Sequence, residues 1–164
     1  MKRFILTLIS FFVMTVVGHN AVGKTLVVYF SATGTTARAA QRIARERDAD
    51  LYEIRPAKAY TSADLDWRNA RSRSSVEMND PKARPAIALP AADVAEYEVI
   101  YLGYPIWWDM APRVVETFIE SHDLSGKTII PFATSGSSGI ANSVSVLRKR
   151  YLGLNWQAGR LMNR

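Results

Sequence analysis

Thr25-Leu26-Val27-Val28-Tyr29-Phe30 is an apolar, β-branched and aromatic run that passes directly into Ser31-Ala32-Thr33-Gly34-Thr35-Thr36. The first six residues predict a buried strand. The Ser-, Thr- and Gly-rich loop then leads into a predicted helix that reaches about Arg47, because apolar residues recur along it with helical spacing. A strand that passes through a short loop into a helix is the opening unit of an alternating α/β fold.

The rest of the chain repeats this alternation of strand and helix. Further strands are predicted at 51–54, 99–102 and 128–133, and helices begin near 111 and 139. A weaker helical segment is predicted around 62–76, within an irregular stretch from 55 to 90, and a last short apolar run covers 156–162. Strands that alternate with helices predict a parallel sheet with right-handed crossovers.

Composition limits the classes of protein and site. The 164 residues favour one globular domain, with 48% hydrophobic and 22% charged residues and a formal net charge of +6. The absence of cysteine excludes disulfides, thiolate metal sites and a thiol nucleophile. With two histidines, a site built from several histidine ligands is not expected.

Residues 1–21 are set apart from the domain that we expect over 22–164. Lys2 and Arg3 precede an apolar run to Val17 and then small residues, which is the pattern of a secretory signal peptide. The run is too short for a comfortable membrane span, although an uncleaved anchor or a buried N-terminal element stays possible. We therefore expect an exported protein, periplasmic or extracellular, whose contact with a membrane would involve this segment alone.

The residues from Gly18 to Thr25 also match the phosphate-binding loop pattern of nucleoside triphosphatases. That loop needs a helix directly after it, so that the helix N-terminus faces the phosphates. Here Thr25 begins a strand, so we interpret the match as chance.

Three unusual loops follow the predicted strands, and the carboxyl edge of a parallel sheet is where ligands bind. In Ser31–Thr36, backbone N–H groups, a helix N-terminus and four hydroxyls suit a phosphate monoester, although a helix cap alone would use one hydroxyl. Tyr104–Asp109 offers aromatic side chains for stacking on a planar ring, with Trp107 expected on the ring and Trp108 packed inward. Ser135–Gly139 can bring backbone N–H groups to a ligand edge. Together the loops predict a site for a mononucleotide with a flat ring.

The sequence resembles the flavodoxin-like proteins of a divergent bacterial branch. The resemblance is carried by the Ser31–Thr36 loop, Gly103-Tyr104-Pro105-Ile106-Trp107-Trp108, Asp123-Leu124-Ser125-Gly126-Lys127 and the Ser135–Gly139 loop. It implies a doubly wound five-stranded parallel α/β sheet of order 2-1-3-4-5, with FMN as cofactor at the switch point. By position, it assigns cofactor binding to Ser31, Ala32, Thr33, Gly34, Thr35, Thr36, Tyr104, Pro105, Ile106, Trp107, Trp108, Ser135, Gly136, Ser137, Ser138 and Gly139.

Family members continue into a last amphipathic helix, whereas this sequence stops at Arg164. We therefore expect the last helix to be absent and part of one sheet face to be uncovered. The face could be covered by a second copy, by another chain, or by the 55–90 stretch folding back.

The function expected from the resemblance is an FMN-binding redox protein that passes electrons to or from a partner protein or a small quinone-like acceptor. If it is an enzyme, it is an FMN-dependent oxidoreductase, and no side chain is assigned as a general base or nucleophile. The alternative is a binding protein of the same fold that has lost FMN, which the basic charge and the export signal favour. Nucleic acid is not an expected partner, because the arginines occur without a recognition-module signature.

Overall fold

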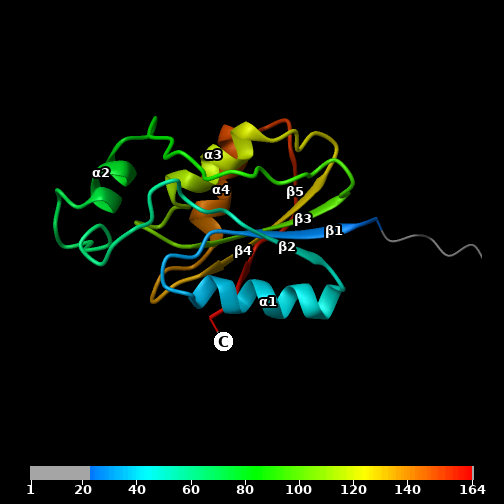
Figure 1. Ribbon diagram of the computed structural model, residues 1–164, viewed down its shortest axis with the longest axis horizontal. Coiled ribbons are helices and arrows are strands. Elements are labelled where there is room, and N and C mark those ends of the chain that lie inside the picture. The colour runs from blue at the N-terminus through cyan, green and yellow to red at the C-terminus, as the bar shows by residue number, and fades with distance from the viewer. Residues whose placement is uncertain (1–22, 164) are drawn as a thin grey trace, which may run out of the picture.

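A computed structural model describes residues 23–163, so the predicted segment 1–21 lies outside the described residues (Figure 1). Helices and strands alternate through most of the chain. In order they are β1 (Thr25–Tyr29), α1 (Thr35–Arg47), β2 (Asp50–Glu53), α2 (Arg73–Asn79), β3 (Val99–Pro105), α3 (Arg113–Ser121), β4 (Thr128–Thr134), α4 (Ala141–Arg150), β5 (Asn155–Trp156) and β6 (Arg160–Leu161).

The strands form one parallel sheet in the order β2-β1-β3-β4-β5, which confirms the predicted order. Two short strands share the edge position next to β4, because β5 and β6 each pair with a different part of β4 in parallel. In register, Val28 of β1 lies beside Leu102 of β3, and Gly103 lies beside Phe132 of β4. The loops after β1, β3 and β4 consequently leave the same edge of the sheet.

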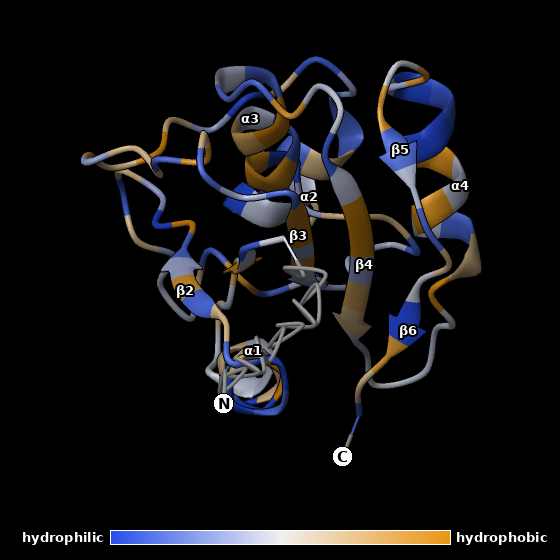
Figure 2. Cartoon of the chain, turned by 90° about the vertical axis from the view of Figure 1, so that its right-hand side faces the viewer, coloured by the Kyte–Doolittle hydropathy of each residue, from blue (hydrophilic) through white to orange (hydrophobic). Residues whose placement is uncertain are grey.

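Helices lie on both faces of the sheet, with α1 below it and α3 and α4 above it (Figures 1 and 2). Alternate strand residues point to opposite faces. Val28, Leu102 and Ile129 therefore join the larger core beneath α3 and α4, whereas Val27 and Phe132 join a smaller core against α1.

The predicted helix around 62–76 is wrong, since this segment is a series of turns that ends in the short α2. Thr61 and Asp64 cap each other: the Thr61 N–H and hydroxyl both donate to the Asp64 carboxylate at 2.9 Å, and the Asp64 N–H donates to Thr61 Oγ1 at 3.2 Å. Such local side-chain bonds compete with a continuous helix. Ser72 then caps α2 by accepting a hydrogen bond from the Ser75 N–H.

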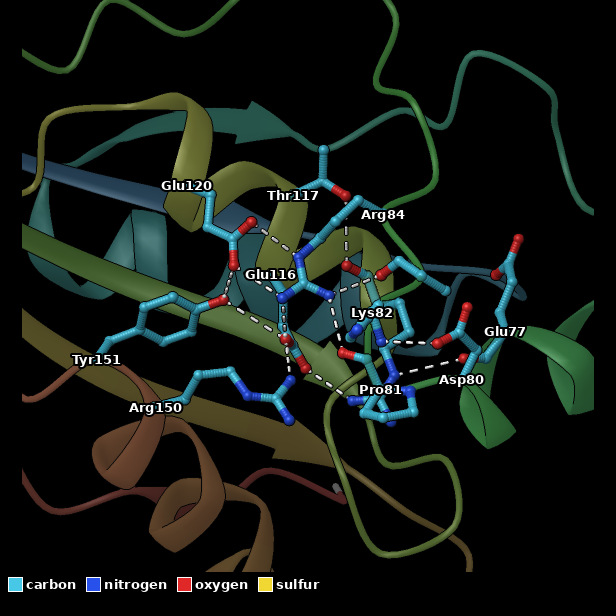
Figure 3. A network of polar contacts seen from close by, with 12 residues as sticks. Glu77, Asp80, Pro81, Lys82, Arg84, Glu116, Thr117, Glu120, Arg150 and Tyr151 are labelled. Carbon is cyan, nitrogen blue, oxygen red and sulfur yellow. Dashed lines mark hydrogen bonds and ion pairs between the residues drawn. The ribbon is translucent and has the colours of Figure 1, made fainter.

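A polar network fastens the stretch between α2 and β3 to the upper helices (Figure 3). Glu116 on α3 is 1% exposed, and its carboxylate pairs with the guanidinium groups of Arg113, Arg84 and Arg150. Arg84 also bonds Glu120. Arg84 is thus anchored on the opposite side of the sheet from α1, so this part of the 55–90 stretch does not cover the α1 side.

On the α1 side, Phe132 of β4 packs with apolar residues of α1 such as Ile43. A Cβ built at Gly103 would lie 2.1 Å from the Phe132 Cζ atom, so the buried Phe132 ring lies directly over the glycine. Met162 is also buried in this core. From β6 to residue 163 no helix follows, and self-association through this face stays a prediction.

We expect Gly103→Ala to lower the free energy of unfolding by about 1–3 kcal/mol, because an added methyl group must displace a packed aromatic ring. Urea denaturation followed by circular dichroism measures the change. Gly153→Ala is the matched control, since a Cβ there meets nothing within 4 Å. Equal midpoints for the two variants would contradict the close packing at Gly103.

Candidate cofactor site

A cavity of about 550 Å³ opens at the carboxyl edge of the sheet. The three predicted loops contribute to it, together with a segment before and within α2. Its lining consists of Ala32, Thr33, Leu65, Trp67, Ser74, Pro105, Ile106, Trp107, Trp108, Asp109, Ser135, Gly136, Ser137 and Ser138.

The loop after β1 uses two of its four hydroxyls for its own structure. Ser31 Oγ accepts a hydrogen bond from the Gly34 N–H at 3.1 Å, which closes the loop. Gly34 has a φ of 86°, a left-handed conformation that glycine adopts without strain. Thr36 is buried and shares a 2.8 Å hydrogen bond with the Thr134 hydroxyl, so it ties the loop to β4. Ser31 and Thr36 therefore position the loop.

The other two hydroxyls, of Thr33 and Thr35, are exposed beside the N-terminus of α1. Gly34 gives α1 no side-chain cap, and the first turn carries no acidic residue. The first N–H groups of a helix have no partner within it and attract anions. This loop therefore suits a phosphate group.

Arg38 adds a positive charge at this loop that the sequence analysis did not assign to it. Its Nη2 atom donates to Thr35 Oγ1 at 3.3 Å, and its Nη1 atom lies 3.6 Å from the position of a Cβ on Gly34. Long side chains on a helix lean toward its N-terminus, so an arginine at the fourth helical position could have been assigned to the loop.

The two tryptophans after β3 differ in packing and exposure, and the choice of Trp107 for the ring contact stays a prediction. Trp107 packs edge-on against Phe30 and Tyr60, with ring centroids 5.6 and 5.3 Å apart. Trp108 is 45% exposed. Both tryptophans line the cavity, and Trp108 presents the larger free surface for stacking.

Tyr104 does not flank the cavity, in contrast to the expectation. β3 continues to Pro105, so Tyr104 is still a strand residue and its ring points into the core beneath α4, fully buried. Its hydroxyl shares a 3.1 Å hydrogen bond with Ser143, and burial raises the pKa of Tyr104 to about 12. It is a core residue, whereas Pro105 and Ile106 line the cavity as expected.

The loop after β4 is partly bonded within itself. Ser135 Oγ accepts from the N–H groups of Ser137 at 3.3 Å and Ser138 at 2.9 Å, which fixes the loop at the cavity wall. Gly136 faces open space, and Gly139 lies outside the cavity lining, in contrast to the expectation.

Leu65, Trp67 and Ser74 form a further wall that sequence reasoning missed. Tyr60 connects this wall to the aromatic loop. Its ring contacts Trp107, the Arg73 guanidinium lies 4.0 Å from its centroid, and its hydroxyl donates to Glu77. Burial and the Glu77 bond raise the pKa of Tyr60, so its hydroxyl stays a hydrogen-bond donor.

Among residues 23–163, no group of three His, Cys, Asp or Glu side chains could hold a metal ion. Nor does this part of the chain contain a helix long and apolar enough to cross a membrane.

The flavodoxin family model matches residues 24–164. A protein from Bacteroides eggerthii classed as a flavoprotein is 63% identical, over 86% of this chain and 89% of that chain, with a TM-score of 0.85. A similar protein from Bacteroides uniformis is 61% identical, over 86% and 90% of the two chains, with a TM-score of 0.85.

A flavoprotein from Lactobacillus acidophilus, solved in complex with FMN, shares the fold at 24% identity, with a TM-score of 0.72 over 85% of this chain and 93% of that chain. Among curated proteins, no sequence matches. The match to the family model and the two close relatives establish that this chain belongs to the flavodoxin family.

Proposed function

We propose that this chain binds FMN in the cavity at the carboxyl edge and works as a redox protein. The observation that carries the proposal is the pairing of an uncapped, hydroxyl-rich helix start with an aromatic wall at one 550 Å³ cavity. One end suits a phosphate monoester and the other a flat heterocycle, and FMN contains both. The FMN complex of the Lactobacillus relative supports the same ligand.

Each part of the cavity would hold a different part of FMN. The phosphate would bind the free N–H groups of α1, with the hydroxyls of Thr33 and Thr35 and the charge of Arg38 beside them. The isoalloxazine ring would lie against Trp108, and Ser137 and Ser138 would adjoin its edge. When bound, FMN supplies the electron-transfer chemistry.

The aromatic wall would also set the surroundings of the ring. Trp107 is held by Phe30 and Tyr60, so it offers a firm apolar surface that keeps water from one part of the cavity. We propose that electrons then pass to or from a partner protein or a small acceptor. The signal-like segment 1–21 supports an exported location for this exchange.

Titration of FMN into purified apo-protein, followed by quenching of flavin fluorescence, tests the proposal. We expect saturable 1:1 binding of FMN and much weaker binding of riboflavin, which lacks the phosphate. Absence of FMN binding would contradict the proposal and favour a protein of this fold that works without the flavin. Equal affinity for FMN and riboflavin would contradict the phosphate assignment.

A further inference from the structure

Trp67 is a large aromatic side chain that the fold leaves 71% exposed at the cavity. The backbone that carries it is nevertheless tied by several hydrogen bonds. The Thr61 and Asp64 caps fix one side, the Ser74 N–H donates to the Asp64 carbonyl at 3.0 Å, and the Ser72 N–H donates to the Asn69 carbonyl at 2.9 Å. A loop held by its own hydrogen bonds thus places the Trp67 indole at the mouth of the cavity and leaves it exposed.

The surroundings of Trp67 carry little net charge. Its neighbours Asp66 and Arg68 form an ion pair at 3.2 Å, which cancels both charges locally. Leu65 adds an apolar surface, and Asp109 is the one charged side chain among the described residues that line the cavity. A ligand at this mouth therefore meets aromatic and aliphatic groups, which suits an uncharged molecule.

The side chain of Trp108 is also exposed, and the backbone at this residue has an unfavourable left-handed conformation. Trp108 and Asp109 have φ values of 46° and 62°, at the centre of a two-residue turn closed by reciprocal 2.9 Å bonds between Trp107 and Met110. Such a turn favours Asn and Gly, so a tryptophan and an aspartate there adopt a strained left-handed conformation. Asn142 supports the turn by donating to the Asp109 carbonyl at 3.0 Å. Strained residues of this kind are enriched at ligand sites.

We propose that the mouth of the cavity, with Trp67 as its principal contact, binds a second ligand: a small, flat, uncharged electron acceptor of the quinone class. This inference rests on the proposed function, since the acceptor would stack between Trp67 and the open side of FMN, while Trp108 contacts the flavin. Conversion of the quinone to a hydroquinone needs two electrons and two protons, which FMN held in the cavity would supply once a separate two-electron donor of the reduced-nicotinamide class had reduced it. A concave mouth lined by isolated aromatic side chains suits a small molecule better than a protein surface does.

The test uses the FMN-loaded protein and the variant Trp67→Ala. Binding of 1,4-dimethoxynaphthalene, which is flat, uncharged and not reduced by flavin, is measured by the change in flavin absorbance. We expect Trp67→Ala to raise its Kd about tenfold, because a stacking surface is lost. When protein whose flavin has been photoreduced beforehand is mixed with 1,4-naphthoquinone, the quinone concentration that gives half the maximal rate of flavin oxidation should rise by a similar factor, while the maximal rate and the Kd of FMN stay within about twofold.

Two further variants separate stacking from a general effect of substitution. Trp67→Phe keeps an aromatic face and should restore most of the affinity. Leu89→Ala removes another exposed apolar side chain, 86% exposed and outside the cavity lining, and should leave every constant unchanged.

Unchanged binding of both aromatic ligands in Trp67→Ala would overturn the inference while leaving FMN binding intact. An equal weakening of FMN and of dimethoxynaphthalene would also overturn it, because Trp67 would then be part of the flavin site. A wild-type protein that binds no FMN would refute the proposed function itself, and the inference with it.

Discussion

Glu116→Gln is expected to lower the free energy of unfolding by about 3–5 kcal/mol, as breaking a buried ion pair does elsewhere. Glu116 is 1% exposed, and its Oε1 atom accepts from Arg113 Nη1 at 2.8 Å. Arg84 lies 3.1 Å from Oε2, and Arg150 bonds the same oxygen (Figure 3). One carboxylate thus balances three guanidinium groups at the junction of α3, α4 and the stretch before β3.

Arg113 is the reason for the large effect. Its side chain is 3% exposed, and a guanidinium does not lose its proton to escape an unfavourable site. Its remaining N–H groups donate to the carbonyl oxygens of Glu77 and Met78, so it cannot turn toward solvent without breaking those bonds. A glutamine keeps the shape at position 116 and removes the negative charge.

Urea denaturation of wild type, Glu116→Gln and Glu120→Gln gives the comparison. Glu120 bonds Arg84 and Tyr151, but its side chain is 42% exposed, so its loss should cost less than about 1 kcal/mol. The Arg84 and Tyr151 bonds lower the pKa of Glu120. Its contribution is therefore present above the ordinary pKa of glutamate and is lost as the pH falls through the folded-state pKa. Equal costs for the two variants would contradict a special role of the buried carboxylate.

The same network connects stability to the site. Arg113 binds the backbone at the end of α2, and within α2 the Glu77 carboxylate bonds both Arg73 and Tyr60. Tyr60 in turn supports Trp107 at the cavity. The segment that carries Leu65 and Trp67 is therefore connected through α2 to the buried ion pair of Arg113 and Glu116 on α3.

The sheet order and the three loops could be predicted because their signals are local. A β-branched run such as Val27-Val28 followed by a Ser- or Gly-rich turn is visible in a short window, and alternation with helices implies parallel strands. Once the strands are parallel, the three loops must share one edge. This explains why most of the predicted cofactor residues do line, or directly adjoin, one cavity.

Features that depend on distant partners could not be predicted in this way. β3 extends to Pro105 because that residue pairs with Thr134 of β4, and this extension turns Tyr104 into a core residue. From the sequence, the hydroxyls of Ser31 and Thr36 are expected to donate to a ligand. In the structure they form hydrogen bonds with the Gly34 N–H and the Thr134 hydroxyl instead. The wall that includes Trp67 arises where a predicted helix is replaced by capped turns.

The second large effect is expected at the phosphate loop: Thr33→Asp should weaken FMN binding about a thousandfold and leave riboflavin binding nearly unchanged. Thr33 is exposed, lines the cavity and adjoins the uncapped start of α1, so an aspartate there is tolerated by the fold. Two unit charges about 4 Å apart near a protein surface interact by about 4 kcal/mol, which is close to three orders of magnitude in Kd.

Thr33→Asn is the matched control, because asparagine has the size of aspartate without its charge and can still donate a hydrogen bond. We expect it to change the Kd of FMN by about tenfold at most, the value of one hydrogen bond. Raising the salt concentration should recover part of the loss in Thr33→Asp and little of that in Thr33→Asn, since salt screens charge repulsion between exposed groups. If aspartate and asparagine weakened FMN equally, or if riboflavin binding fell as much as FMN binding, the phosphate would lie elsewhere. The loop after β1 would then be a helix start and no more.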